Sequence, residues 1–151
     1  PLDRHPEIGN NIVLARQLGM EVRGWFGEYR GAPIGVWGEL DLPREVLGAR
    51  LGELLGSLPR LLPGGPERVR RVGVISGGGG PMIRQAFETG LDTFITGEGP
   101  HWTFFEAEEL GLNAFFAGHY ATETVGVKAL AAHLAERFQV PWSFIDHPTG
   151  L

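Results

Sequence analysis

The sequence predicts an α/β fold with a mixed, largely parallel sheet and flanking helices. In the second half of the chain, short apolar runs typical of strands alternate with helical patterns, as they do where helices connect parallel strands. In the first half, aromatic and β-branched residues mix with glycines over residues 21–40, which indicates two antiparallel strands. Right-handed crossovers make such a sheet the simplest topology for these elements.

The elements of the first half follow from local patterns. A helix over about residues 10–18 is expected to end at Gly19. The two strands are expected to join near Gly31 to Pro33. Pro43 suits the first position of a second helix, which continues to about Leu58. Residues 59–66 are rich in glycine and proline, so they are predicted as a loop.

The second half is predicted to alternate strictly. Strands are expected at 69–76, 92–96, 113–117 and 142–146, and helices at 81–89, 102–110 and about 122–138. If the strands are parallel, the loops after them lie at one edge of the sheet, where open α/β folds bind ligands. These loops contain Gly77–Gly80, Thr96–Glu98, Gly118–His119 and Asp146–His147.

The composition is typical of one globular domain. The chain has 151 residues, of which 42% are hydrophobic and 21% charged, so residues 1–151 are read as a single region. The loop at 59–66 could mark a boundary between subdomain parts 1–58 and 67–151. The formal net charge is −5 and Lys and Arg are scattered, which disfavours nucleic acid as a partner. No apolar run reaches the roughly 18 residues of a membrane span, and we expect a cytoplasmic protein.

The sequence contains no cysteine and no Gly-x-Ser-x-Gly element. Disulfides and thiolate metal ligands are therefore excluded for these residues, and a metal would have to be held by His, Asp or Glu. Covalent catalysis by serine or cysteine is not expected.

His119 and Glu123 are the pair on which the functional prediction depends. They are four residues apart at the start of a predicted helix, so both side chains project from one face. A nitrogen and a carboxylate oxygen together suit zinc, manganese or iron. The alternative is a Glu favoured by the helix dipole beside a His that only caps the helix.

Glu123 is also predicted to begin a buried face. The helical spacing continues through four apolar residues, Val127, Leu130, Leu134 and Phe138. Because an unpaired buried carboxylate is costly, we expect a cation beside Glu123.

Further candidates lie in the strand-end loops. Gly77–Gly80 could hold a phosphate on backbone N–H groups, but it lacks the Lys-Ser/Thr of a P-loop, and a tight turn that makes room for a nearby site is preferred. Glu98 could bond a loop, orient a metal ligand or act as a base. Asp3 and His101 are read alone as loop residues, and His133 as a surface histidine.

In their order along the chain, four segments resemble those of the NIF-three-like dinuclear metal centre proteins, also called GTP cyclohydrolase I type 2 homologues. The segments are Pro1–Asn11, Ser76–Gly80, Phe94–Glu98 and Gly118–Glu123. The resemblance implies the NIF-three-like fold and two divalent ions, with Asp3, His119 and Glu123 as metal ligands. It also implies a toroidal homo-hexamer whose sites face an internal cavity.

Two departures from the family pattern matter. Members carry a pair of adjacent histidines well before the Asp3 loop, and this sequence starts too late to contain them, so we expect it to be the C-terminal portion of a longer chain. Many relatives also have a histidine four residues after the equivalent of Glu98. Here that residue is Trp102 and His101 is one earlier, so His101 is assigned only as a contact to substrate or to a metal ligand.

The leading hypothesis is a metal-dependent hydrolase, or cyclohydrolase-like enzyme, with a dinuclear centre of zinc, iron or manganese. Its substrate would be a small molecule, nucleotide-like in one reading, with Glu98 and His101 as proton-transfer groups. The alternative is a metal-stabilised hexameric scaffold without catalysis. A weaker alternative is a nucleotide-binding module built on Gly77–Gly80.

Overall fold

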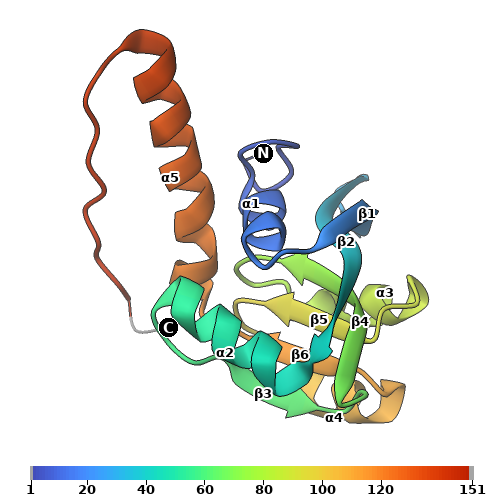
Figure 1. Cartoon of the computed structure of the whole chain (residues 1–151). Coiled ribbons are helices and arrows are strands. Elements are labelled where there is room, and N and C mark those ends of the chain that lie inside the picture. The colour runs from blue at the N-terminus through green and yellow to red at the C-terminus, as the bar shows by residue number, and fades with distance from the viewer. Residues whose placement is uncertain (1, 150–151) are drawn as a thin grey trace.

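A six-stranded mixed sheet runs through the molecule (Figure 1). The computed structural model describes residues 2–149. The strands are β1 (Glu21–Tyr29), β2 (Ala32–Pro43), β3 (Arg60–Pro63), β4 (Arg68–Ile75), β5 (Thr93–Thr96) and β6 (Asn113–Phe116), in the order β1-β2-β4-β5-β6-β3. β4, β5 and β6 are parallel, while β1–β2, β2–β4 and β3–β6 are antiparallel pairs. The predicted α/β class with a mixed sheet is confirmed.

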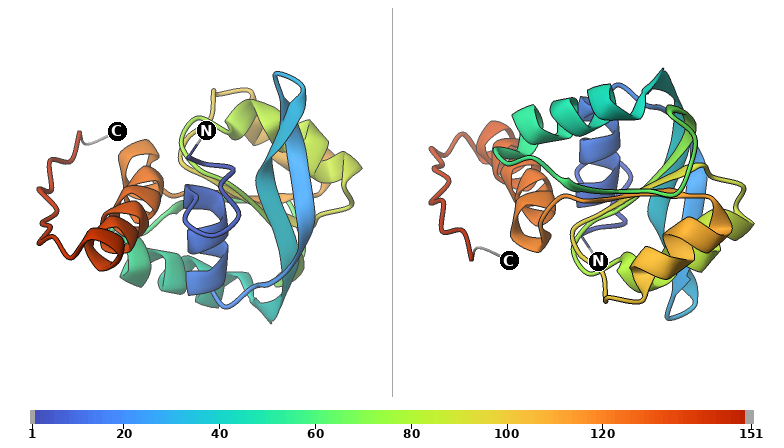
Figure 2. Two further views of the ribbon diagram at one scale, coloured as in Figure 1. Left: turned by 90° about the horizontal axis from the view of Figure 1, so that it is seen from above. Right: turned by 90° about the horizontal axis from the view of Figure 1, so that it is seen from below.

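Helices cover both faces of this sheet (Figure 2). α1 (Asn10–Gln17) and α2 (Arg44–Leu55) lie on one face. The short 3₁₀ helix η1 (Gly80–Met82), α3 (Ile83–Glu88) and α4 (Thr103–Leu110) follow on the other, and α5 (His119–Phe138) stands at the side. Of the helices within residues 2–149, none combines the length and apolar composition needed to cross a membrane.

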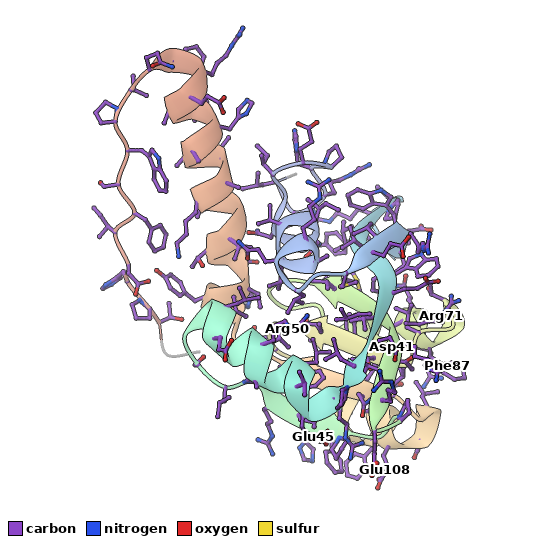
Figure 3. The ribbon with its side chains drawn as sticks, in the orientation of Figure 1. Asp41, Glu45, Arg50, Arg71, Phe87 and Glu108 are labelled. Atoms are coloured by element: carbon purple, nitrogen blue, oxygen red, sulfur yellow. The ribbon has the colours of Figure 1, made fainter. Side chains whose placement is uncertain are left out.

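The two faces have separate cores because side chains alternate along each strand. In β5, Ile95 packs with the α1 and α2 core, which includes Leu14 and Leu51, whereas Phe94 packs with the other core beside Ile83. Arg50, labelled in Figure 3, ties α2 to the end of α1 by donating to the backbone oxygen of Leu18 at 2.6 Å. The sheet and its helices therefore form a fixed frame for the strand-end loops.

The segment predicted as a loop at 59–66 contains a strand, so that part of the prediction is wrong. β3 pairs antiparallel with β6, with Arg60 opposite Phe116 and Leu62 opposite Ala114. The strand is only four residues long, and the surrounding Gly and Pro hide so short an apolar run in the sequence. Its pairing buries Leu62 on the α4 face.

The prediction of a strand at residues 142–146 is also wrong. These residues are extended but unpaired, and they run back alongside α5 (Figure 1). The place next to β6 that a further strand would take is already occupied by β3. The segment is instead attached to α5, with Lys128 Nζ 4.2 Å from the centre of the Phe144 ring and the Tyr120 hydroxyl donating to Asp146 at 2.9 Å.

Candidate metal centre

Three strand-end loops meet at the carboxyl edge of β4, β5 and β6. The parallel register aligns Ile75 with Thr96, and Thr96 with Phe116. The loops then bond to one another, since the Glu98 N–H donates to the Gly77 oxygen at 3.0 Å. This arrangement confirms the predicted meeting of the loops that carry Gly77, Glu98 and His119.

His119 lies between two carboxylates. Its Nδ1 is 2.7 Å from Glu98 Oε1, and its Nε2 is 3.4 Å from Glu123 Oε1. A carboxylate only accepts hydrogen bonds, so the Glu98 contact places a proton on Nδ1 and leaves Nε2 directed at Glu123. The hydrogen bond that His119 donates to Glu98 is the largest cause that raises the pKa of His119 above its usual value. Burial lowers this pKa by less, and the charges of Glu123 and Glu98 raise it further.

The geometry of this pair fits a shared cation. Two ligands that each bind a tetrahedral ion at about 2.1 Å are about 3.4 Å apart, and this is the distance between His119 Nε2 and Glu123 Oε1. Gly77 leaves space beside them, because a Cβ there would lie 2.3 Å from Glu123 Oε1 and 3.0 Å from His119 Nε2. The glycine cluster thus makes room for this pair. This agrees with the interpretation of the cluster that the sequence analysis preferred over a phosphate-binding loop.

Glu123 is not buried, and the prediction that a buried apolar face continues from it along the helix is wrong. The side chain of Glu123 is 44% exposed, and Val127, Leu134 and Phe138 are exposed as well. α5 packs mainly on α1, and only its first turns meet the body of the protein. Its buried residues therefore lie near its start, and they are Thr122, Val125 and Gly126. Burial therefore gives no reason for a cation beside Glu123, and the expected cation stays a prediction that rests on the position of His119.

Asp3 lies next to the pair without joining it. Its Oδ1 accepts a hydrogen bond from Asn10 Nδ2 at 2.8 Å and is 3.5 Å from the hydroxyl of Ser76, the neighbour of Gly77. Within residues 2–149, no three His, Asp or Glu side chains are gathered closely enough to hold an ion between them. His119 and Glu123 are thus a pair of candidate ligands, and Asp3 is an adjacent candidate that does not reach them.

Buried polar residues that the sequence analysis did not single out hold these loops together. The Asn10 Oδ1 accepts the N–H of Gly126 in α5 at 2.7 Å, and the Asn11 Oδ1 accepts the N–H of Ser76 at 2.7 Å. The Thr122 hydroxyl accepts the N–H of Gly77 at 2.9 Å. Two adjacent asparagines in a helix that is otherwise mostly apolar are the sequence feature that could have indicated them.

His101 is placed away from His119 by its contacts. The ring centres of His101 and Phe105 are 5.7 Å apart and the two rings are nearly perpendicular. Together they border a cavity of about 370 Å³ that is also lined by Phe104 and Phe116. The larger cavity, of about 810 Å³, lies between α2, the start of α5 and the C-terminal segment. It meets Tyr120 and Thr124, a different side of α5 from His119 and Glu123.

The glycine loop offers few free donors to a phosphate. The N–H of Gly77 donates to the Thr122 hydroxyl, and the N–H of Gly80 donates to the backbone oxygen of Glu98 at 3.0 Å. The helix that follows is a short 3₁₀ turn and α3 has six residues, which gives a weak dipole. His133 is exposed on α5, as expected of a surface histidine.

This arrangement of loops can be compared with known proteins. The family model of Duf34/NIF3 (NGG1p interacting factor 3) matches residues 1–149. This chain belongs to the Duf34/NIF3 family. The family resemblance of the four sequence segments is thereby confirmed.

Individual Duf34/NIF3 relatives match the whole chain but extend beyond it. The chain is 45% identical over 155 residues to the "GTP cyclohydrolase 1 type 2 homolog" of Deinococcus radiodurans, covering 100% of this chain and 58% of the relative. It is 46% identical over 154 residues to the protein of that name from Pyrococcus horikoshii, covering 100% and 61%. The crystal structure of TTHA1606 from Thermus thermophilus superposes with a TM-score of 0.86 and 45% identity, covering 100% of this chain and 60% of that one. The chain thus spans about 60% of the length of these relatives.

Proposed function

We propose that this chain supplies part of a dinuclear divalent-metal centre and that the protein acts as a metal-dependent hydrolase on a small, nucleotide-like substrate. The observation that carries the proposal is the placement of His119, with Glu98 on one ring nitrogen and Glu123 facing the other. A carboxylate on the far nitrogen of a metal-binding histidine is the usual way in which its tautomer and orientation are held.

Each residue has a distinct part in this proposal. His119 Nε2 and Glu123 would hold one ion, and Asp3, whose Oδ1 is bonded to Asn10, would offer its other carboxylate oxygen to the second. Zinc, iron and manganese all accept these donors. Bound ions would supply a nucleophilic water and neutralise charge on the substrate.

Glu98 is first a positioning residue in this scheme, since one of its oxygens bonds the Nδ1 proton of His119. Its side chain is exposed, so the other oxygen is open to substrate and could exchange a proton with it. His101 borders the neighbouring cavity, which makes it a proton-transfer candidate on the substrate side.

Elemental analysis of the purified protein tests the metal centre directly. We expect His119→Ala and Glu123→Ala each to lower bound zinc, iron or manganese by at least half, because each removes one ligand. His133→Ala, which changes an exposed histidine of the same helix, serves as the matched control and should keep its metal. Equal metal in all four proteins would reject the proposal.

Hydrolysis of GTP and of bis-p-nitrophenyl phosphate, with and without added metal, tests the activity. Turnover that rises with metal and is lost in His119→Ala supports the hydrolase. If His119→Ala loses metal and assembly while the parent has no turnover, the alternative of a metal-stabilised homo-hexameric scaffold replaces it. The exposed apolar residues of α5, such as Leu134 and Phe138, favour that alternative, because such surfaces mark interfaces.

A further inference from the structure

The cavity of about 370 Å³ beside the candidate metal centre has a lining unlike the rest of the surface. Its apolar walls come from Phe104 and Phe105 on α4 and from Leu62 and Phe116 on the sheet, and the loop Gly99–His101 closes one end. Phe104 and Phe105 are 42% and 50% exposed. The ring centres of Phe104 and Phe105 are 5.5 Å apart and the rings meet edge to face. The two rings therefore pack on each other beside the cavity and do not fill it.

A cation stands at the border of this aromatic cavity. Arg60 is opposite Phe116 in the β3–β6 register, and paired residues point to the same face of a sheet. Among the described residues no carboxylate pairs with the Arg60 guanidinium. The two carboxylates adjacent in sequence to lining residues are already engaged, Glu98 with His119 and Glu106 with Arg84. Arg60 also borders the larger cavity, where Asp146 accepts a hydrogen bond from the Tyr120 hydroxyl. In a chain of net charge −5, an unpaired arginine beside aromatic rings is a site for an anion.

The cavity is joined to the candidate metal centre through the backbone. Gly99 directly follows Glu98, and Phe116 is three residues before His119. Because consecutive Cα atoms are about 3.8 Å apart, the Cα atoms of Phe116 and His119 are at most about 11 Å apart. The residues that line the cavity therefore continue directly into the loops that carry Glu98 and His119.

We propose that this cavity binds the flat aromatic ring of an organic anion, with the ring between the phenylalanines and the anionic group on Arg60. Its volume is at the lower end of the range for small-molecule sites, so it accommodates one ring system. Aromatic walls favour flat rings over saturated ones of similar size. The role of this cavity as the substrate pocket of the hydrolase rests on the proposed function, whereas the binding itself does not require metal.

A titration of the ¹⁵N-labelled, metal-free protein with 2-naphthoate, followed by NMR, tests this proposal. We expect saturable shifts confined to the amides of residues 60–62, 99, 101–105 and 116. Cyclohexanecarboxylate tests the need for an aromatic ring, and 2-naphthamide tests the need for a charge. Both should bind more weakly than 2-naphthoate.

Two variants separate the ring contact from the charge contact. Phe105→Ala should weaken the binding of both naphthyl ligands about five-fold. Arg60→Gln should weaken the binding of 2-naphthoate about three-fold and leave the binding of 2-naphthamide unchanged. Phe87→Ala and Arg70→Gln are the controls, since both residues are exposed and outside the cavity. Phe105 and Arg60 are themselves exposed, so their variants should fold.

Several results would overturn the proposal. These are equal binding of cyclohexanecarboxylate and 2-naphthoate, shifts elsewhere in the protein, or no binding below roughly millimolar concentration. A change of oligomeric state in Phe105→Ala on sedimentation would show that the cavity is an interface between copies of the chain. If the protein binds no metal but still binds 2-naphthoate as described, the hydrolase proposal fails and the pocket remains.

Discussion

His119 depends on its two neighbouring carboxylates for its chemistry. Glu98 fixes which ring nitrogen carries the proton, and Glu123 sits where the other nitrogen points. A proton and a metal ion compete for the same Nε2 lone pair. Because Glu98 also raises the pKa of His119, the metal binding proposed for His119 should weaken as the pH falls.

Glu98→Gln should lower the pKa of His119 toward its ordinary value of 6.5, because the charge and the strong acceptor are both removed. The titration of the His119 ring in metal-free protein, followed by NMR, measures this. A raised folded pKa stabilises the protein while His119 is protonated. That contribution is complete below about pH 6.5 and is lost as the pH rises through the folded pKa. The stability difference between parent and Glu98→Gln should therefore shrink on the alkaline side. Glu109→Gln, on α4, should not change the titration.

Gly77→Ala should disturb the pair more than the fold. Gly77 has a φ of +63°, and its added Cβ would press on Glu123. Gly31→Ala is the matched control, since Gly31 has a φ of +80° with no atom within 4 Å of the added Cβ. Both variants should lose about 1–2 kcal/mol of unfolding free energy from the positive φ. Only Gly77→Ala should lose bound metal, and equal metal in both would show that Gly77 does not shape the site.

At the scale of elements, α1 joins the Asp3 loop to α5. Asn10, at the start of α1, donates to Asp3 and accepts the N–H of Gly126 in α5. The contact is close, because a Cβ on Gly126 would lie 2.5 Å from Asn10 Oδ1. The element that carries His119 and Glu123 is thereby held at a fixed distance from the loop that carries Asp3.

Asn10→Ala should lower the unfolding free energy by about 2–3 kcal/mol, because it leaves buried partners without hydrogen bonds. Chemical denaturation measures this change. Gln17→Ala, an exposed residue of the same helix, should cost less than about 0.5 kcal/mol. A loss in Asn10→Ala no greater than in the control would show that the bridge between the two elements has no role in stability.

At the scale of the whole molecule, α5 and the segment after it extend away from the sheet (Figure 1). Six of their large apolar residues are exposed: Val127, Leu134, Phe138, Val140, Trp142 and Ile145. A surface of this kind is typical of an interface. It fits both the greater length of the relatives and the proposed homo-hexamer.

Leu134→Ser and Phe138→Ser should weaken self-association while changing the unfolding free energy of the chain by less than about 0.5 kcal/mol. Sedimentation equilibrium over a range of concentrations measures the association. Phe87→Ser is the control, because Phe87 is equally apolar and exposed but lies on α3, at the end of the molecule opposite α5 (Figure 3). Unchanged association in the α5 variants would remove this face from the assembly.

Much of the architecture is determined by local sequence patterns. The antiparallel pair β1–β2, the alternation from β4 to α5 and the strand-end position of Glu98 and His119 follow from periodicity and from glycine placement. The His119–Glu123 pair follows from helical spacing alone, because residues four apart share a face whatever the helix packs against.

Other features were decided only by tertiary contacts. β3 exists because β6 offers it an edge, and residues 142–146 are no strand because that edge is taken. The contact of Glu98 with His119 and the bridge through Asn10 join residues that are more than twenty positions apart in the sequence. The exposure of Glu123 depends on how α5 extends from the sheet (Figure 1). The period of a segment shows which of its residues share a face, but only the packing of the segments determines which face meets the core.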